Sequence, residues 1–124
     1  MRQQYHIRHD ASGSQIWDVH RLVRLTRDLP VQRIALADIR EMHEAYWFDD
    51  RHPTTLEIID HMRLAQQADL AYPIILCPKG RIMDGMHRVC KAVLHGDADI
   101  AAVQLRAMPE PDYVNVSLDD LPYD

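Results

Sequence analysis

Apolar and polar residues alternate along the chain in blocks that predict helices and short strands. The first 14 residues are polar and weakly patterned, so we expect a mobile or edge segment there. Over residues 15–29 apolar side chains recur at helical spacing, and Pro30 ends that pattern. Val31–Leu36 then has the pattern of a strand. The first 36 residues are therefore expected to hold a polar segment, a helix and a strand.

A second helix is predicted to begin just after Thr54. Thr54 and Glu57 have the spacing of a capping box, in which each side chain binds the backbone N–H of the other residue. Apolar residues recur downstream with the period of a helix that buries one face. We expect this stripe to belong to the core, and it consists of Ile58, Ile59, Met62 and Ala65.

The second half of the chain predicts three further strands and a third helix. Pro73–Cys77 is almost entirely apolar, which predicts a strand that is buried on both faces. A turn and the short apolar run Ile82–Met83 follow. Apolar residues within Val89–Leu94 have helical spacing, and Gly96 is a natural stop for that helix. Ile100–Leu105 predicts the last strand.

Together these elements indicate one small α+β domain, with a four- or five-stranded mixed sheet and helices packed against it. We divide the chain into a polar segment over 1–14, the domain over 15–108, and an acidic tail over 109–124. The tail contains prolines and no lysine or arginine. We expect it to be extended, and to wrap the surface or become ordered at an interface.

Charge and composition limit the function classes. The chain has 124 residues, 47% of them hydrophobic, and a formal net charge of −5. The negative excess lies in the tail, so the rest of the chain is balanced and offers no strongly basic surface for sequence-independent DNA binding. No apolar run approaches transmembrane length, no signal-peptide pattern follows Met1, and the two cysteines lack metal or redox spacing. We therefore expect a soluble, cytoplasmic protein without a membrane partner.

The main candidate for chemistry is the corner where a predicted strand turns through Asp84 and Gly85 into a helix. The first N–H groups of a helix and its dipole favour an anion, typically phosphate, and glycine lets the backbone approach a ligand closely. His87 and Arg88 lie in the first helical turn, where a guanidinium can grip phosphate oxygens through two donors. Lys91, one turn further, adds charge. In the alternative interpretation, Asp84 only caps the helix and the cations face solvent.

The segment Asp84–Arg88 reads Asp-Gly-Met-His-Arg and is followed by an alanine-containing helix, a glycine and a strand. This pattern resembles the signature of the ParB/sulfiredoxin-like superfamily, over about Pro30 to about Leu105. ParB proteins have Gly-Glu-Arg-Arg here, and sulfiredoxins have Gly-Gly-Cys-His-Arg. Met86 stands where sulfiredoxins have their catalytic cysteine, and a thioether cannot act as that nucleophile. The best match is Asp-Gly-His-His-Arg of the ParB-like free serine kinases, with Met86 replacing the first histidine.

The resemblance implies a ParB/sulfiredoxin-like fold, in which a hairpin leads into a site for nucleotide phosphates. A nucleoside triphosphate with Mg²⁺ would occupy this corner, because phosphoryl transfer depends on positioning and charge neutralisation. The residues expected to contact the phosphates are Gly85, Met86, His87, Arg88 and Lys91. The chain shows no metal-ligand cluster of its own, so the ion is expected to be shared with the phosphate oxygens.

Two acidic residues are the candidates for catalysis. Asp84 would orient or hold the metal ion. In the free serine kinases a glutamate soon after the first strand deprotonates the substrate hydroxyl, and Glu44 is the best positional match, with Glu41 as the alternate. Trp47 belongs to an aromatic run, Tyr46–Phe48, which is expected either to stack a nucleotide base or to anchor its loop onto the core.

The implied functions fall into three classes. The first is a small-molecule kinase or slow nucleotide hydrolase, with an unknown small-molecule or protein acceptor. The second is a non-catalytic, nucleotide-responsive module associated with DNA partition or regulation, in which the nucleotide changes a surface or a homodimer contact. Too few residues follow Leu105 for a DNA-reading domain, so direct sequence-specific DNA binding is not expected. The third is a relative that keeps the fold without the ligand.

Two substitutions express these expectations. Arg88 is expected to lie outside the core, so Arg88→Ala should abolish anion binding with little loss of fold. Glu44→Gln should leave binding intact and stop turnover. Undiminished turnover would remove Glu44 from the mechanism.

Overall fold

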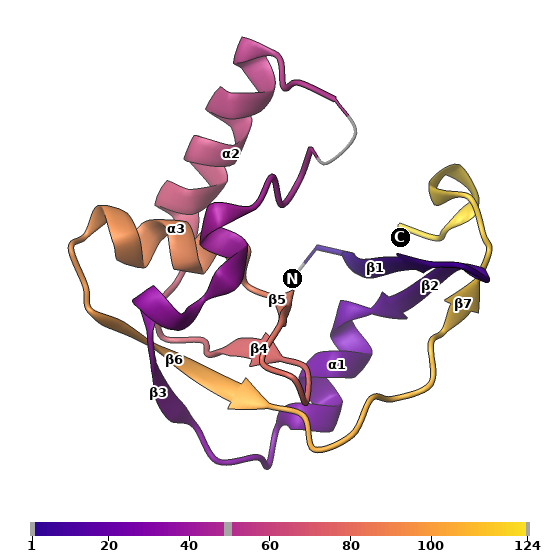
Figure 1. Cartoon of the computed structure of the whole chain (residues 1–124), viewed down its shortest axis with the longest axis horizontal. Helices are drawn as coiled ribbons and strands as arrows, with labels where there is room; N and C mark the ends of the chain where they lie inside the picture. Colours follow the sequence, from indigo (N-terminus) through magenta and orange to yellow (C-terminus); the bar gives the residue numbers. More distant parts are fainter. Residues whose placement is uncertain (1, 49–50, 124) are drawn as a thin grey trace.

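The computed structural model describes residues 2–48 and 51–123, which form two sheets and three α-helices (Figure 1). The larger sheet has the order β3-β6-β4-β5, and the smaller one has the order β1-β2-β7. The strands of the larger sheet are β3 (Gln32–Ala35), β4 (Ile74–Leu76), β5 (Ile82–Asp84) and β6 (Asp99–Gln104). Those of the smaller sheet are β1 (Tyr5–Asp10), β2 (Gly13–Asp18) and β7 (Tyr113–Val114). The helices are α1 (Val19–Thr26), α2 (Thr55–Gln67) and α3 (Met86–Leu94).

The larger sheet is mixed, because β4 pairs parallel with β6 and antiparallel with β5. Alternate residues of β4 face opposite sides of the sheet, as the pleat of a strand requires. Ile74 and Leu76 pack in one apolar cluster with Val89 of α3, and Ile75 packs in a second cluster with Leu22 of α1. Two helices thus cover the two faces of the sheet, and the prediction that this strand is buried on both sides is confirmed.

The α+β class and the four strands predicted over residues 31–105 are confirmed. The single predicted sheet is incomplete, however, because a second, antiparallel sheet joins the two ends of the chain. In that sheet Gln15 lies opposite Val114 and Ile16 opposite Tyr113. The acidic tail therefore wraps the surface, where it adds one short strand and the 3-10 turn Leu118–Asp120.

The first predicted helix begins later than its apolar pattern indicated. Gly13–Asp18 form a strand, and α1 starts at Val19 after Asp18, whose carboxylate accepts a hydrogen bond from the His20 N–H at 2.8 Å. Ile16 and Trp17 are both buried, and β2 is the middle strand of its sheet. The apolar residues of this strand thus have helical spacing only by coincidence. The domain boundary that we placed at residue 15 falls inside β2.

The capping box at the start of α2 is confirmed, with Thr54 and Glu57 each bound to the backbone N–H of the other. The burial predicted for the stripe of this helix is wrong except at Ala65. Helix α3 lies between α2 and the larger sheet, so α2 packs on α3 instead of on a strand (Figure 1). The exposed fractions are 47% for Ile58, 44% for Ile59 and 54% for Met62, against 2% for Ala65.

Within residues 2–48 and 51–123, no helix combines the length and the apolar character that a membrane crossing demands.

Candidate functional site

The predicted corner is present, since β5 ends at Asp84 and α3 begins at Met86. Gly85 joins them in a left-handed conformation, with φ of 113° and ψ of 19°. A Cβ atom at this position would lie 2.5 Å from Cγ2 of Ile74, so only glycine fits without a shift of the neighbouring strand. The first N–H groups of α3 follow directly after this corner, and helix geometry leaves them without an intrahelical partner.

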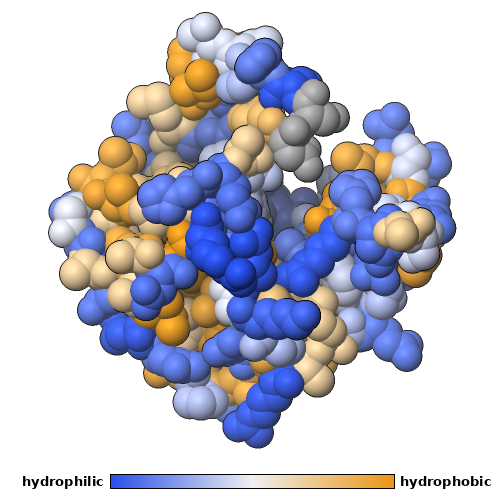
Figure 2. Space-filling view, in the orientation of Figure 1, coloured by the Kyte–Doolittle hydropathy of each residue, from blue (hydrophilic) through white to orange (hydrophobic). Residues whose placement is uncertain are grey.

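A cleft of about 1260 Å³ opens at this corner, between the larger sheet on one side and the smaller sheet with α1 on the other. Residues 84–88 all line it, and the surface is hollowed between the region over α2 and the region over the smaller sheet (Figure 2). The opposite wall carries basic and imidazole side chains from the start of the chain and from the residue that follows α1. They are Arg2, His6, His9 and Arg27. An anion in the cleft would meet a helix N-terminus and two arginines.

Arg88 lines the cleft, but its guanidinium is bound to the chain itself. It donates to the Asp84 carboxylate at 2.7 Å and to the carbonyl oxygens of Tyr72 at 3.1 Å and Pro73 at 2.8 Å. The Arg88 side chain is only 15% exposed and that of Asp84 only 13%. The expectation that Arg88 lies outside the core and can be removed with little loss of fold is therefore wrong.

Lys91 is directed away from the predicted phosphate site. Its Nζ donates to the carbonyl oxygens of Gln66 at 3.1 Å and Ala68 at 2.6 Å, at the C-terminal end of α2. A cation at a helix C-terminus satisfies carbonyl groups that have no partner within the helix. Lys91 thus joins α2 to α3, and it is not among the residues that line the cleft.

His87 and Trp47 are brought together with His61 of α2, which the sequence did not single out. Nδ1 of His61 lies 2.8 Å from Nε2 of His87, so the two imidazoles share a hydrogen bond. Burial, followed by the charges of His61 and Arg2, lowers the pKa of His87 to about 4. Burial also lowers the pKa of His61. The pair is therefore neutral near pH 7, and His87 offers hydrogen bonds there instead of positive charge.

The two imidazoles lie on the same face of Trp47. The ring centroids of His61 and His87 are 4.0 Å and 4.6 Å from that of Trp47, with interplanar angles of 22° and 19°. Their own centroids are 5.1 Å apart, whereas rings stacked on opposite faces of an indole would be separated by roughly twice the stacking distance. One face of Trp47 is thus already covered by protein, which leaves less of the indole for a nucleotide base.

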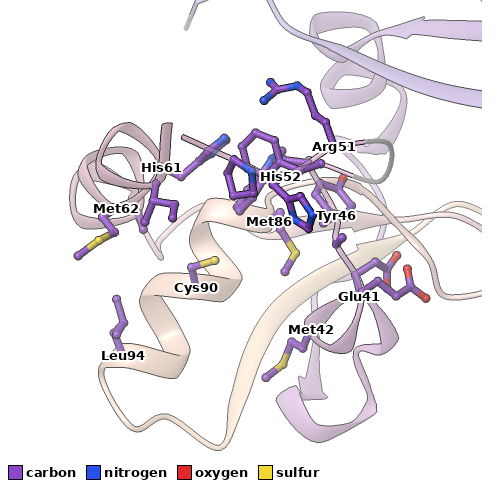
Figure 3. A pocket seen from close by; sticks show the side chains of 17 residues that line it. Glu41, Met42, Tyr46, Arg51, His52, His61, Met62, Met86, Cys90 and Leu94 are labelled. Carbon is purple, nitrogen blue, oxygen red and sulfur yellow. The ribbon is translucent and has the colours of Figure 1, made fainter. Parts of the chain in front are cut away.

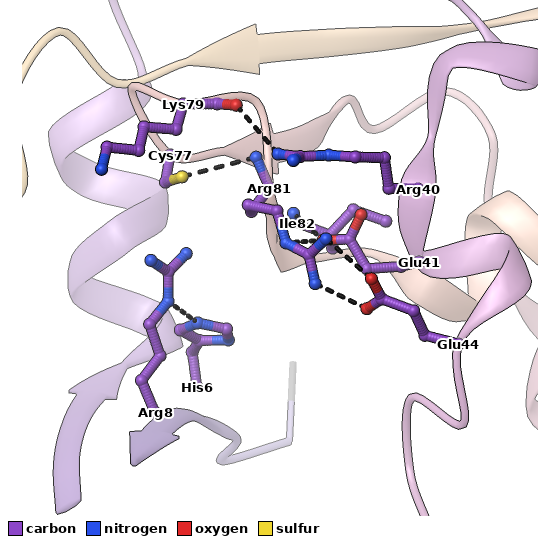
Figure 4. Close-up of polar contacts among 9 residues, drawn as sticks. All are labelled: His6, Arg8, Arg40, Glu41, Glu44, Cys77, Lys79, Arg81 and Ile82. Atoms are coloured by element: carbon purple, nitrogen blue, oxygen red, sulfur yellow. Dashed lines mark hydrogen bonds and ion pairs between the residues drawn. The ribbon is translucent and has the colours of Figure 1, made fainter. Parts of the chain in front are cut away.

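The candidate bases Glu41 and Glu44 are held by contacts with Arg81 and Ile82, at the start of β5 (Figure 4). Glu44 forms a two-pronged ion pair with Arg81, through contacts of 2.9 Å and 2.5 Å, and this contact lowers the pKa of its carboxyl group. Glu41 is 2% exposed and accepts from the Ile82 N–H at 2.6 Å. Both glutamates line a second cavity and not the cleft.

This second cavity is an apolar groove of about 560 Å³ between α2, α3 and the segment before α2 (Figure 3). Met86 and Cys90 of α3 face Met62 of α2 across it, and His61 lies at its edge. The groove and the cleft meet at three residues that line both, namely Tyr46, Trp47 and Met86. Burial, followed by the charges of Glu41 and Asp84, raises the pKa of Tyr46 to about 12, so its phenol stays neutral.

Tertiary packing brings two residues to the site that no sequence pattern had indicated. Arg2 belongs to the weakly patterned first segment, and His61 is one polar residue on a helix. His61 reaches the corner because α2 packs against α3, and Arg2 because the start of the chain lines the same cleft.

No cluster of three or more metal-ligating side chains occurs in the part of the chain that the structure describes. Mg²⁺ that is bound with a nucleotide is usually held by one or two protein carboxylates. Asp84 is a carboxylate on the cleft wall, and in this structure it is paired with Arg88. Comparison of the chain with protein-family models, characterised proteins and solved structures gave no significant match.

Proposed function

We propose that the cleft binds a nucleotide whose phosphates rest on the first turn of α3, with Arg2 as their cationic partner. The observation that carries the proposal is the convergence of three features on one cleft: a helix N-terminus, the left-handed Gly85 before it, and Arg2. Arg2 lies close enough to His87 to lower its pKa, so its charge acts at the corner. Helix N–H groups and guanidinium groups are both strong phosphate ligands.

The contacts favour a nucleotide-responsive binding module over a kinase or hydrolase. A general base must reach the acceptor hydroxyl, yet Glu44 is paired with Arg81 and lines the groove instead of the cleft. Asp84 is likewise paired with Arg88. We propose Asp84 as the carboxylate nearest a Mg²⁺ ion carried in by the nucleotide, and the first turn of α3 as the element that senses occupancy.

Thermal unfolding tests the proposal, because a ligand that binds only the native state raises its melting temperature. The ligands are ATP, ADP, CTP, GTP and inorganic pyrophosphate, each with and without Mg²⁺. We expect a nucleotide to raise the melting temperature of the wild type, and Arg2→Ala to lose most of that rise. Arg24→Ala is the matched control, because Arg24 is an exposed arginine of α1 that does not line the cleft.

Equal nucleotide shifts in Arg2→Ala and Arg24→Ala would place the phosphates elsewhere. The absence of any shift in the wild type would overturn nucleotide binding altogether. Phosphate release measured on the same samples separates the two functions, since a binding module holds the nucleotide without turnover. Turnover that Asp84→Asn or Glu44→Gln abolishes would identify an enzyme instead.

A further inference from the structure

Helices α2 and α3 carry large apolar side chains that the chain leaves uncovered. Six of these residues form what we call the apolar patch: Leu56, Ile58, Ile59, Met62, Val93 and Leu94. Figure 2 shows hydrophobic surface over both helices. The exposed fractions are 64% for Leu56, 47% for Ile58, 44% for Ile59, 54% for Met62, 42% for Val93 and 72% for Leu94. A residue with a large apolar side chain has roughly 150–200 Å² of surface, so the patch exposes roughly 500–600 Å². That value is at the upper end for a monomer, whose apolar patches of this size mark interaction sites.

We propose that the apolar patch is the interface of a homodimer, in which α2 of one copy packs antiparallel against α2 of the other. Leu56 and Met62 lie three residues before and after Ile59, at i, i+3 spacings along one side of the helix. A two-fold axis through Ile59 therefore brings Leu56 of one copy against Met62 of the other and Ile59 against itself. This self-complementarity is what an isologous interface requires.

The charges around the patch favour a second copy over a charged partner. Asp60 and Arg63 form an ion pair at 3.0 Å on α2, and Arg51 pairs with Glu57 at 2.5 Å near the start of the helix. Among the described residues, each of these two ion pairs is balanced in charge, so they give no preference for an acidic or a basic partner. The acidic tail, which accounts for the negative excess of the chain, lies with the smaller sheet on the opposite side from α3 (Figure 1). The described part of the acidic tail therefore adds no like-charge repulsion between two copies that meet at the patch.

The available area agrees with a dimer. Complete burial of the patch in both copies would remove roughly 1,000–1,200 Å² of apolar surface from water, and a specific interface needs about 1,000 Å² or more in total. Side chains at the rim, such as Asp60 and Arg63, would add polar area to this apolar centre. The groove of about 560 Å³ beside the patch leaves room for side chains of the second copy.

Sedimentation velocity over a wide range of protein concentration tests the dimer. We expect the wild type to sediment as a dimer that dissociates on dilution, and Ile59→Lys to be a monomer at every concentration. Lysine at the two-fold axis would place two like charges against each other in an apolar interface. Leu25→Lys is the matched control, because Leu25 is an exposed leucine of α1, 48% exposed, and should leave the dimer unchanged.

Cysteine cross-linking locates the interface independently of dimer stability. In Ile59→Cys the two introduced thiols would lie next to each other at the axis, so mild oxidation should yield a disulfide-linked dimer. Leu25→Cys and the wild type, which retains Cys77 and Cys90, should stay uncross-linked. Circular dichroism spectra equal to that of the wild type establish that the variants are folded. A wild type that remains a monomer at the highest concentration, or a dimer that Ile59→Lys leaves intact, would overturn the proposal.

Discussion

The cationic side chains of α3 are hydrogen-bonded to carbonyl and carboxylate oxygens of the chain itself. Arg88 connects the first turn of the helix to Asp84 and to the backbone of Tyr72 and Pro73. Lys91 holds the C-terminal end of α2 in the same way. Both residue types have long, flexible side chains, so the position of the partner decides whether a cation binds a ligand or the fold. At the residue scale, the structure gives Arg88 and Lys91 internal partners.

Arg88→Ala is expected to lower the free energy of unfolding by about 2–4 kcal/mol, because it leaves the shielded Asp84 carboxylate without its cation. Guanidinium-chloride unfolding measures the loss. Arg63→Ala, which breaks an exposed ion pair on α2, is expected to cost less than about 1 kcal/mol. The double variant Arg88→Ala, Asp84→Ala should recover part of the stability. Equal midpoints for Arg88→Ala and the wild type would show that these contacts do not stabilise the fold.

At the scale of elements, the junction of β5 and α3 depends on the absence of a side chain at Gly85. Its backbone has a φ of 113°, which side-chain-bearing residues rarely adopt, and its Cα faces Ile74 of the neighbouring strand. The junction thereby sets both the direction of α3 and the opening of the cleft.

Gly85→Ala is expected to destabilise the protein by about 2–4 kcal/mol, through the positive φ and the overlap with Ile74. Gly80→Ala separates the two causes, because Gly80 has a φ of 82° with no atom within 4 Å of a built Cβ. We expect Gly80→Ala to cost only about 1 kcal/mol. Thermal or denaturant unfolding of both variants checks this order. Equal losses would mean that the backbone conformation, and not the contact with Ile74, limits this position.

At the scale of the whole molecule, the smaller sheet joins the two ends of the chain and forms one wall of the cleft. Its strand β1 carries His6, whose Nε2 accepts a hydrogen bond from Nε of Arg8 at 2.9 Å (Figure 4). The His6 ring also lies 5.9 Å from that of Trp17, which is buried. Burial, together with the charge of Arg8, lowers the pKa of His6 to about 4. The folded structure therefore favours the neutral form of His6.

The protein is expected to lose stability as the pH falls from 6.5 towards 4. In that range the unfolded chain binds a proton at His6, with the ordinary pKa of 6.5, while the folded chain does not. The free energy of unfolding should therefore decrease by up to about 3 kcal/mol through His6. His87 acts in the same direction. Urea unfolding at several pH values measures this slope.

His6→Gln is the diagnostic variant for this effect, because an amide oxygen can still accept from Arg8 but does not titrate. Its stability should fall less steeply between pH 6.5 and 4 than that of the wild type. An unchanged slope would assign the acid sensitivity to other groups.

Much of the fold could be predicted because the elements are specified locally. The apolar run of β4, the capping box at Thr54 and the Asp84–Gly85 corner each depend on residues a few positions apart. The helix start predicted at residue 15 was wrong, because apolar residues at positions 16 and 19 are compatible with both a helix and a strand. Pairing of β2 with the two ends of the chain decided between them.

The candidate site could be predicted only in part, because only some of its features depend on residues that are close together in the sequence. The corner, its glycine and the residue types of the first turn of α3 could be predicted, since they follow from adjacent positions. The contacts between Arg88 and Asp84 and between His61 and His87, and the exposure of Ile59, arise only when the chain is folded. Those outcomes depend on which distant elements pack together, and a periodic pattern shows that a face is apolar without showing what covers it.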